Sequence, residues 1–316
     1  MVLFHRQRAG YEEGNTMKKI LALLGLLPLA VQAAVPLFDG VQSAENQLLT
    51  QSGRWFVSGE NGVFEGRFDG RVYSKQRLTA RLLNGQAHQC YFLGMTERQG
   101  RLYTVCTDNA LNPLATKRLF VLNLADPAGE LNEMFNPTDV ALPNGMATLP
   151  DGSLLLADSG APLLPGKLLR FTVNAHGAVD GQSVYYRYVL NKPNGLKVDG
   201  QRLYVSLNPL TYAGLSQLRR YTLGAAGPQD GTVLYGSWGF LDDFALSSDG
   251  VVVAEFLAGR ISHVSESGQV LRRADVAQPT SALLWHGAGV AAGDVTVTER
   301  GNGRLVRVPG FAAWPR

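Results

Sequence analysis

Hydrophobic and polar residues alternate in short runs that recur along the chain, and each run lies beside a tight turn at Asp-Gly or a related pair. The six turns are Asp69-Gly70, Gln99-Gly100, Asp151-Gly152, Asp199-Gly200, Asp249-Gly250 and Gly293-Asp294. The third, fourth and fifth turns are separated by 48 and 50 residues. Runs of β-branched and aromatic residues around such turns predict β-hairpins, and a repeat near fifty residues indicates a repeated architecture.

Each repeat also has room for two further strands. After the third turn these are residues 167–173 and 183–186, and after the fourth they are residues 218–223 and 232–235. A hairpin alone cannot bury a core, whereas six units of four strands can close into a ring. The sequence therefore predicts an all-β fold, a six-bladed β-propeller with four antiparallel strands per blade. Because the first two turns are only 30 residues apart, a short first blade is expected.

The N-terminal segment has the features of an export signal. Met17 is followed by two lysines and an apolar run from Ile20 to Val31, which ends in Val31-Gln32-Ala33. This pattern is typical of a secretory signal peptide, and the run is shorter than the roughly 20 residues of a membrane-spanning helix. We expect residues 1–33 to be a non-native extension plus a signal peptide, and residues 34–316 to form one propeller domain in the periplasm or outside the cell. The alternative is a buried core helix.

Charge gives no support for a nucleic-acid partner. The net charge of the whole chain is +3 at pH 7, and residues 1–33 hold four basic and two acidic side chains. The remaining chain therefore carries about +1, without the basic character of nucleic-acid-binding domains. We expect no nucleic acid, no membrane span and a small-molecule partner; the oligomeric state stays open.

The two cysteines lie on one predicted hairpin. Cys90 begins one strand and Cys106 ends the next, with the Gln99-Gly100 turn about midway between them. Cross-strand neighbours can meet the Cα separation of a disulfide, and an exported protein meets an oxidising compartment. We expect a Cys90–Cys106 disulfide; the alternative is two buried free thiols.

Oxygen-bearing side chains precede the strands that are expected to line the central channel. Each precedes a turn glycine by six to ten residues, and the four are Glu60, Asn144, Asn194 and Asp243. Any one of them is an ordinary turn residue, but their recurrence at matched offsets favours a shared role. Carboxylate and amide oxygens that converge suit Ca²⁺, which takes six to eight oxygen ligands. The sequence therefore predicts a metal site on the axis, with Ca²⁺ or another divalent cation.

The segments Pro143-Asn144-Gly145 and Pro193-Asn194-Gly195-Leu196, with Asp243 ahead of Asp249-Gly250, resemble the gluconolactonase/senescence-marker-protein family. That family is related to the serum paraoxonases, and the resemblance runs from about Trp55 to Val308. It implies a six-bladed, calcium-dependent propeller that hydrolyses lactones or related esters. It also implies Glu60, Asn194 and Asp243 as metal ligands and Asn144 as a ligand or substrate contact.

The resemblance is incomplete for one catalytic feature. His88 lies where paraoxonases carry a catalytic histidine, but Asp108-Asn109 falls where they place the second histidine of a pair. As the base that activates water we expect Asp243, with His88 and Asp242 in reserve, and we expect Asn144 and Asp242 to contact substrate. The chain has no Gly-x-Ser-x-Gly motif, so a serine hydrolase mechanism has no support.

Two other functions fit the same pattern. An exported propeller can be a non-enzymatic binding module with a structural metal, since fold does not determine function. A strictosidine-synthase-like enzyme is a third possibility. If the protein is a hydrolase, the loops 108–116, 161–165 and 208–214, which are rich in Pro and Leu and poor in charge, favour apolar or aromatic substrates over sugar lactones.

Overall fold

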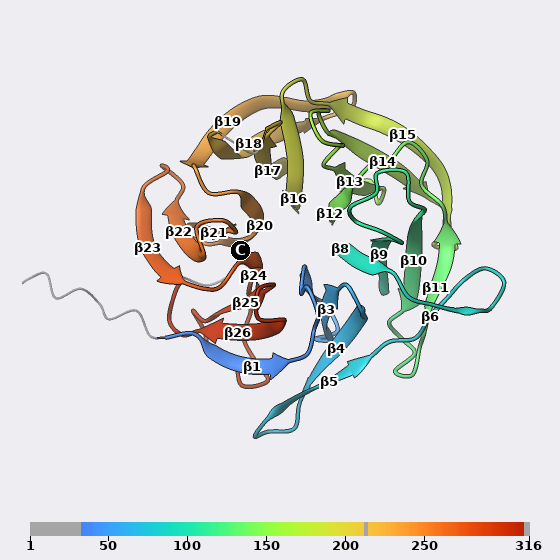
Figure 1. The fold of residues 1–316 in the computed structure, drawn as a ribbon, viewed down its shortest axis with the longest axis horizontal. Helices are drawn as coiled ribbons and strands as arrows, with labels where there is room; N and C mark the ends of the chain where they lie inside the picture. Colours follow the sequence, from blue (N-terminus) through green and yellow to red (C-terminus); the bar gives the residue numbers. More distant parts are fainter. Residues whose placement is uncertain (1–32, 212–213, 313–316) are drawn as a thin grey trace, which may run out of the picture. The chain divides into compact units, whose positions relative to one another are not determined.

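The structure is a computed structural model that describes residues 33–211 and 214–312. The predicted signal peptide lies outside the described residues, except for Ala33. The described part contains strands and no helix, and so none that could span a membrane. Its six sheets are arranged around one axis (Figure 1), which confirms the predicted six-bladed β-propeller.

The strands follow the predicted repeat closely. In the first blade they are β2 (Gln47–Leu49), β3 (Trp55–Gly59), β4 (Gly62–Phe68) and β5 (Tyr73–Arg77). In the second they are β8 (Tyr91–Arg98), β9 (Arg101–Thr107), β10 (Lys117–Asn123) and β11 (Leu131–Phe135), and the short β6 (Ala80–Arg81) and β7 (Ala87–His88) extend its outer edge. In the third they are β12 (Pro143–Thr148), β13 (Leu154–Asp158), β14 (Lys167–Val173) and β15 (Val179–Arg187).

The remaining blades have the same order. The fourth blade contains β16 (Asn191–Asp199), β17 (Arg202–Pro209), β18 (Ser216–Gly224) and β19 (Gly227–Ser237). The fifth contains β20 (Leu241–Ser247), β21 (Gly250–Glu255), β22 (Arg260–Ser265) and β23 (Val270–Asp275). The sixth contains β24 (Pro279–Leu284), β25 (Val295–Glu299) and β26 (Arg304–Val308), and its fourth strand is β1 (Val35–Asp39).

The ring is closed by the pairing of β1 with β26. The two strands are antiparallel, and Val35 lies opposite Arg307 while Asp39 lies opposite Arg304. The N-terminal strand of the described chain thereby completes the sheet that the C-terminal strands begin (Figure 1), so β26 is paired on both sides and β1 forms the outer edge of the sheet.

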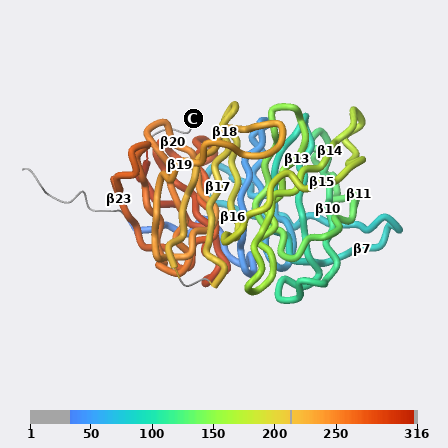
Figure 2. Tube along the Cα trace, turned by 90° about the horizontal axis from the view of Figure 1, so that it is seen from above, coloured from blue at the N-terminus to red at the C-terminus, as the bar shows by residue number. Residues whose placement is uncertain are grey.

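Hydrophobic side chains pack between neighbouring blades. Six buried clusters occur in the described residues, one at each interface between blades; Phe56, Phe92 and Phe120, for example, belong to the cluster between the first and second blades. Seen from the side, the strands run between the two faces of the ring (Figure 2). The turns that join the first strand of each blade to the second lie on one face of the ring. Each innermost strand begins at the opposite face.

The first blade differs from the prediction in its register. The Asp69-Gly70 turn joins β4 to β5, so it does not correspond to the turns that join the first and second strands of other blades. The corresponding turn contains Gly53, 47 residues before Gly100. The first blade is nevertheless short, as expected: it spans Gln47–Arg77, whereas the third blade spans Pro143–Arg187 and the fourth Asn191–Ser237. The turn was assigned wrongly because the three-residue strand β2 gives too weak a pattern to be recognised.

The two cysteines are joined by a disulfide in the second blade. Cys106 lies on β9 opposite Phe92 of β8, and Cys90 immediately precedes β8. Their Cα atoms are 5.9 Å apart. The bond links the innermost strand of the blade to the second strand at the face where the innermost strands begin.

Candidate active site on the propeller axis

Four innermost strands contain the same irregularity near their start. The strand register shifts between Phe92 and Met95 in β8, and the same occurs after Pro143 in β12, Pro193 in β16 and Leu241 in β20. A bulge of this kind redirects a side chain and is common beside active sites. The residues at the first bulge position are Leu93, Asn144, Asn194 and Asp242, which are therefore structurally equivalent.

The second bulge position packs against the innermost strand of the next blade. A Cβ atom on Gly145 would lie 2.5 Å from the carbonyl oxygen of Asn194, and one on Gly195 would lie 2.6 Å from Oδ1 of Asp243. Only glycine fits at these two positions, because a Cβ atom would collide with the neighbouring strand. In β20 the equivalent position is Asp243, whose side chain occupies the room that Gly195 leaves.

The first bulge positions line a cavity of about 370 Å³ on the axis. Glu45 lies two residues before β2, the innermost strand of the first blade. It lines the cavity together with Asn144, Asn194 and Asp242. Arg300, from the turn after β25, is the one cation among the lining residues. The remaining lining residues are Tyr91, Leu93, Ala110, Leu111, Leu142, Phe240, Phe256 and Leu257.

Glu45 lies at the centre of a buried network. The hydroxyl of Tyr91 donates to Oε2 of Glu45 at 2.7 Å, and Nη1 of Arg300 lies 3.4 Å from the same oxygen. The Arg300 guanidinium also lies over the Tyr91 ring, 5.6 Å from its centroid. Burial raises the pKa of Glu45, against the opposing effect of Arg300. Burial and then the Glu45 charge raise the pKa of Tyr91, which keeps its hydroxyl protonated.

Asp242 and Asn194 form the other side of this cluster. Asp242 is 5% exposed, and burial, followed by the charges of Glu45 and Asp243, raises its pKa well above the ordinary value. Asn194 is 3% exposed, and its Oδ1 is buried without a hydrogen-bond partner. A buried amide oxygen without a partner costs free energy unless a ligand satisfies it.

These oxygens fit a hard divalent cation. Two buried carboxylates, Glu45 and Asp242, and the unpartnered oxygen of Asn194 line one cavity, and a positive ion would relieve both the like-charge repulsion and the missing partner. Among the described residues no group of three or more His, Cys, Asp and Glu side chains could hold a metal ion. A cation here would therefore depend on amide oxygens, with Asn194 as the required third ligand and Asn144 within the same cavity.

The side chain of Asp243 forms its contacts outside the cavity. Nζ of Lys197 lies 2.7 and 2.6 Å from its two oxygens, and Asn46 donates to Oδ2 at 3.0 Å. The carboxylate is 4% exposed, and it is not among the residues that line the cavity. The structure therefore brings Asn144, Asn194 and Asp242 of the predicted residues together and places Asp243 in an ion pair beside them.

The structure does not bring Glu60 or His88 to this cavity. Glu60 lies in the exposed turn between β3 and β4, where it accepts a hydrogen bond from Ser43 at 2.8 Å. It does not precede an innermost strand, so that part of the prediction is wrong, because β2 and not β3 is innermost. His88 lies on β7 at the outer edge of its sheet, with Nε2 2.9 Å from Asp108.

Sequence reasoning missed Glu45, Tyr91 and Arg300. A signal for Glu45 was present, because it lies eight residues before Gly53, as Asn144 lies eight residues before Gly152. Asp242, likewise, lies eight residues before Gly250. No comparable spacing marks Tyr91 or Arg300, which reach the cavity through the packing of separate blades.

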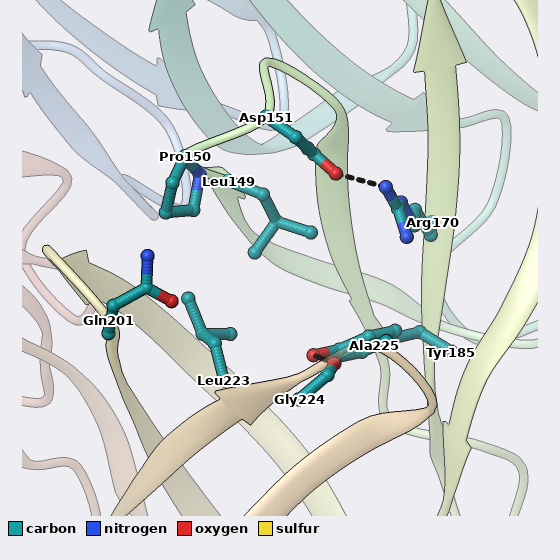
Figure 3. A pocket seen from close by; sticks show the side chains of 9 residues that line it. All are labelled: Leu149, Pro150, Asp151, Arg170, Tyr185, Gln201, Leu223, Gly224 and Ala225. Atoms are coloured by element: carbon teal, nitrogen blue, oxygen red, sulfur yellow. Dashed lines mark hydrogen bonds and ion pairs between the residues drawn. The ribbon is translucent and has the colours of Figure 1, made fainter.

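Two other depressions in the described part of the chain contain none of this cluster. A pocket of about 210 Å³ lies beside the turn between β12 and β13 (Figure 3), where Arg170 pairs with Asp151. A groove of about 850 Å³ is lined by the loops after β9, β11 and β13, and there Lys167 lies 2.8 Å from Asp139. The groove also contains a buried carboxylate, Asp158, which lies 3.5 Å from Nζ of Lys167. The axial cavity differs in bringing two buried carboxylates together, Glu45 and Asp242.

The fold and the axial cavity define a six-bladed propeller with a polar site at its centre. No family model matches the sequence, and no curated protein matches it. Among solved structures the chain is similar to a gluconolactonase from Xanthomonas campestris, with 17% identity over 87% of this chain and 88% of that chain and a TM-score of 0.61. The likeness extends over most of both chains and shows the six-bladed propeller fold.

The same fold also occurs in sugar dehydrogenases. A putative glucose dehydrogenase from Thermus thermophilus is 16% identical, with 87% of this chain and 98% of that chain covered and a TM-score of 0.59. A PQQ-bound aldose sugar dehydrogenase from Streptomyces coelicolor is 15% identical, with coverages of 87% and 96% and a TM-score of 0.54. At these identities the similarity establishes the fold, and the activity has to be argued from the site.

Proposed function

We propose that the protein is an exported, calcium-dependent hydrolase of lactones or related esters, with its active site in the axial cavity. The observation that carries the proposal is the convergence of two buried carboxylates, Glu45 and Asp242, on a cavity that also holds the unpartnered oxygen of Asn194. The fold shared with a gluconolactonase supports it. Export, to the periplasm or the medium, rests on the N-terminal segment.

The residues that would hold the ion are Glu45, Asn194 and Asp242, with Asn144 at the same level of the cavity. When bound, Ca²⁺ would supply Lewis-acid stabilisation of negative charge on the carbonyl oxygen. Tyr91 and Arg300 hold the Glu45 carboxylate in place, since both contact its Oε2. Lys197 and Asn46 fix Asp243, and therefore the adjoining backbone of Asp242.

Proton transfer falls to Asp242 in this proposal. Glu45 and Asp242 are the two carboxylates that line the cavity, and Glu45 already accepts from Tyr91 and Arg300. In hydrolysis the oxygen of water bonds to the carbonyl carbon and the ester C–O bond breaks. Asp242 accepts a proton from the attacking water and returns it to the leaving oxygen, so that a hydroxy acid, or an acid and an alcohol, is released.

The test is hydrolysis of a panel of lactones and aryl esters by the purified protein, with Ca²⁺ and with a chelator. We expect activity that the chelator abolishes and that Asp242→Asn lowers by at least 100-fold, on the scale of other losses of acid–base catalysis. Glu60→Gln is the matched control, because Glu60 is exposed and outside the cavity, and it should retain full activity. A folded, calcium-binding protein without turnover on the panel would contradict the hydrolase and favour the binding module.

A further inference from the structure

Arg300 is positioned to bind more than its protein partner. Its guanidinium carbon lies 5.6 Å from the centroid of the Tyr91 ring and 5.9 Å from that of the Phe256 ring, within the range of cation–π contact with both. Among the described residues the one hydrogen-bond partner of the guanidinium is Glu45, at 3.4 Å through Nη1. The side chain is 38% exposed and lines the cavity. A guanidinium has five N–H donors, so most of them are available to a ligand.

The charges of the cavity leave room for one anion. With a divalent cation holding both carboxylates ionised, Glu45 and Asp242 contribute two negative charges and Arg300 contributes one positive charge. A divalent cation on the carboxylates would bring the sum to +1, which one monovalent anion neutralises. A carboxylate matches the fork of an arginine in shape as well as charge.

The walls around Arg300 favour an apolar body on that anion. Phe256 and Leu257 enter from the loop after β21, Leu142 from the loop before β12, and Phe240 from the loop before β20. A sugar acid would place several hydroxyl groups against these side chains without hydrogen-bond partners, whereas a hydrocarbon or aromatic ring would lose only water contacts. Of the three loops expected to shape the mouth, 108–116 contributes Ala110 and Leu111.

We propose that the axial cavity binds carboxylates with an apolar or aromatic body, through an ion pair with Arg300. This substrate class rests on the proposed hydrolase activity. The ligand is then the acid that the enzyme releases from an apolar lactone or an aryl ester. Arg300 is then a specificity-determining residue that favours such acids and their esters over sugar lactones.

The experiment is isothermal titration calorimetry of the full chain with phenylacetate in the presence of Ca²⁺. We expect saturable binding that is at least tenfold tighter than that of gluconate or of uncharged benzyl alcohol. Arg300→Gln should weaken phenylacetate binding by at least tenfold, as expected for a charge-assisted contact, and Arg300→Lys should restore part of it. Arg273→Gln, which changes an exposed arginine on β23, is the control and should bind as the wild type does.

A second variant tests the apolar wall. Phe256→Ala should weaken phenylacetate binding and leave acetate binding unchanged, since acetate has no ring to contact the wall. Equal binding of phenylacetate and gluconate, or unchanged binding by Arg300→Gln, would overturn the inference even if the protein hydrolyses esters. Arg300-dependent binding by a protein without hydrolytic activity would support the inference and contradict the proposed function, so the two failures are distinguishable.

Discussion

At the scale of single residues, the two adjacent aspartates of β20 have different surroundings. Asp242 shares the first bulge position with Asn144 and Asn194, lines the cavity and lies near Glu45. Asp243 takes the second position and is paired with Lys197. The bulge interrupts the regular alternation of the strand and places the two side chains in different surroundings, which the sequence alone does not reveal.

This difference predicts that substituting the two aspartates changes the free energy of unfolding of the metal-free protein in different ways. Asp243→Asn should lower the free energy of unfolding by about 1–3 kcal/mol, because Lys197 loses the charge of its partner. Asp242→Asn should leave it unchanged or raise it, because one of two like charges buried in the cavity is removed. Urea denaturation of both variants with a chelator present measures this. Equal destabilisation by both would contradict the separation of roles.

At the scale of secondary-structure elements, close contact between innermost strands sets the width of the axial ring. Gly145 and Gly195 lie where strands of neighbouring blades approach each other, and neither has a positive φ. Their role is therefore to leave space. The disulfide acts within one blade, where it ties β8 to β9.

The close approach predicts that Gly145→Ala is destabilising. The new methyl group would lie 2.5 Å from the carbonyl oxygen of Asn194 and 2.8 Å from the amide nitrogen of Leu196, so backbone must move, at a cost of about 1–3 kcal/mol. The control is Gly236→Ala on β19, where the nearest atoms are side-chain carbons of Leu215 at 3.4 Å. Equal free energies of unfolding for the two variants would show that the strands do not pack as described.

The disulfide predicts a loss of stability on its removal. The bond closes a loop between residues 16 apart in sequence, and a loop of this length corresponds to about 3 kcal/mol in the chain-entropy model. Cys90→Ser combined with Cys106→Ser should lower the free energy of unfolding by about this amount. Mass spectrometry of unreduced protein after alkylation provides the check on the bond itself. Two alkylated thiols would contradict it.

At the scale of the whole molecule, buried charges at the ends of second strands stabilise the face that bears the cavity. Glu255, at the end of β21, is fully buried and accepts hydrogen bonds from Tyr235 at 2.9 Å, Ser237 at 2.5 Å and Arg260 at 2.8 Å. Burial would raise its pKa, but Arg260 and the hydroxyl groups outweigh burial and lower the pKa below the ordinary value of 4.5.

The lowered pKa predicts the direction of a pH effect. Because the folded protein holds Glu255 ionised more strongly than the unfolded chain does, its contribution to stability is present above pH 4.5 and is lost as the pH falls through the folded pKa. Glu255→Gln should therefore be less stable than the wild type at pH 7, and the difference should shrink below pH 4.5. Chemical denaturation at several pH values measures this. A difference that grows on acidification would contradict the assignment.

The repeat made most of the fold predictable, because hairpins with strong turn residues recur near every fifty positions. The register of the first blade could not be predicted so well, because β2 has only three residues and its turn contains Gly53 without a preceding aspartate. For that reason the expected blade-one residue was Glu60, in the turn between β3 and β4, and Glu45, which lines the cavity, was not considered. Tyr91 and Arg300 lie 209 residues apart, and only the closed ring brings them to one carboxylate.

The measurement that tests the central claim most directly is calcium binding by isothermal titration calorimetry, compared between the wild type, Glu45→Gln and Glu60→Gln. The axial site predicts saturable binding of one Ca²⁺ by the wild type and by Glu60→Gln, and binding at least tenfold weaker in Glu45→Gln. Binding that is lost in Glu60→Gln and kept in Glu45→Gln, or no binding by the wild type, would contradict a calcium site on the propeller axis.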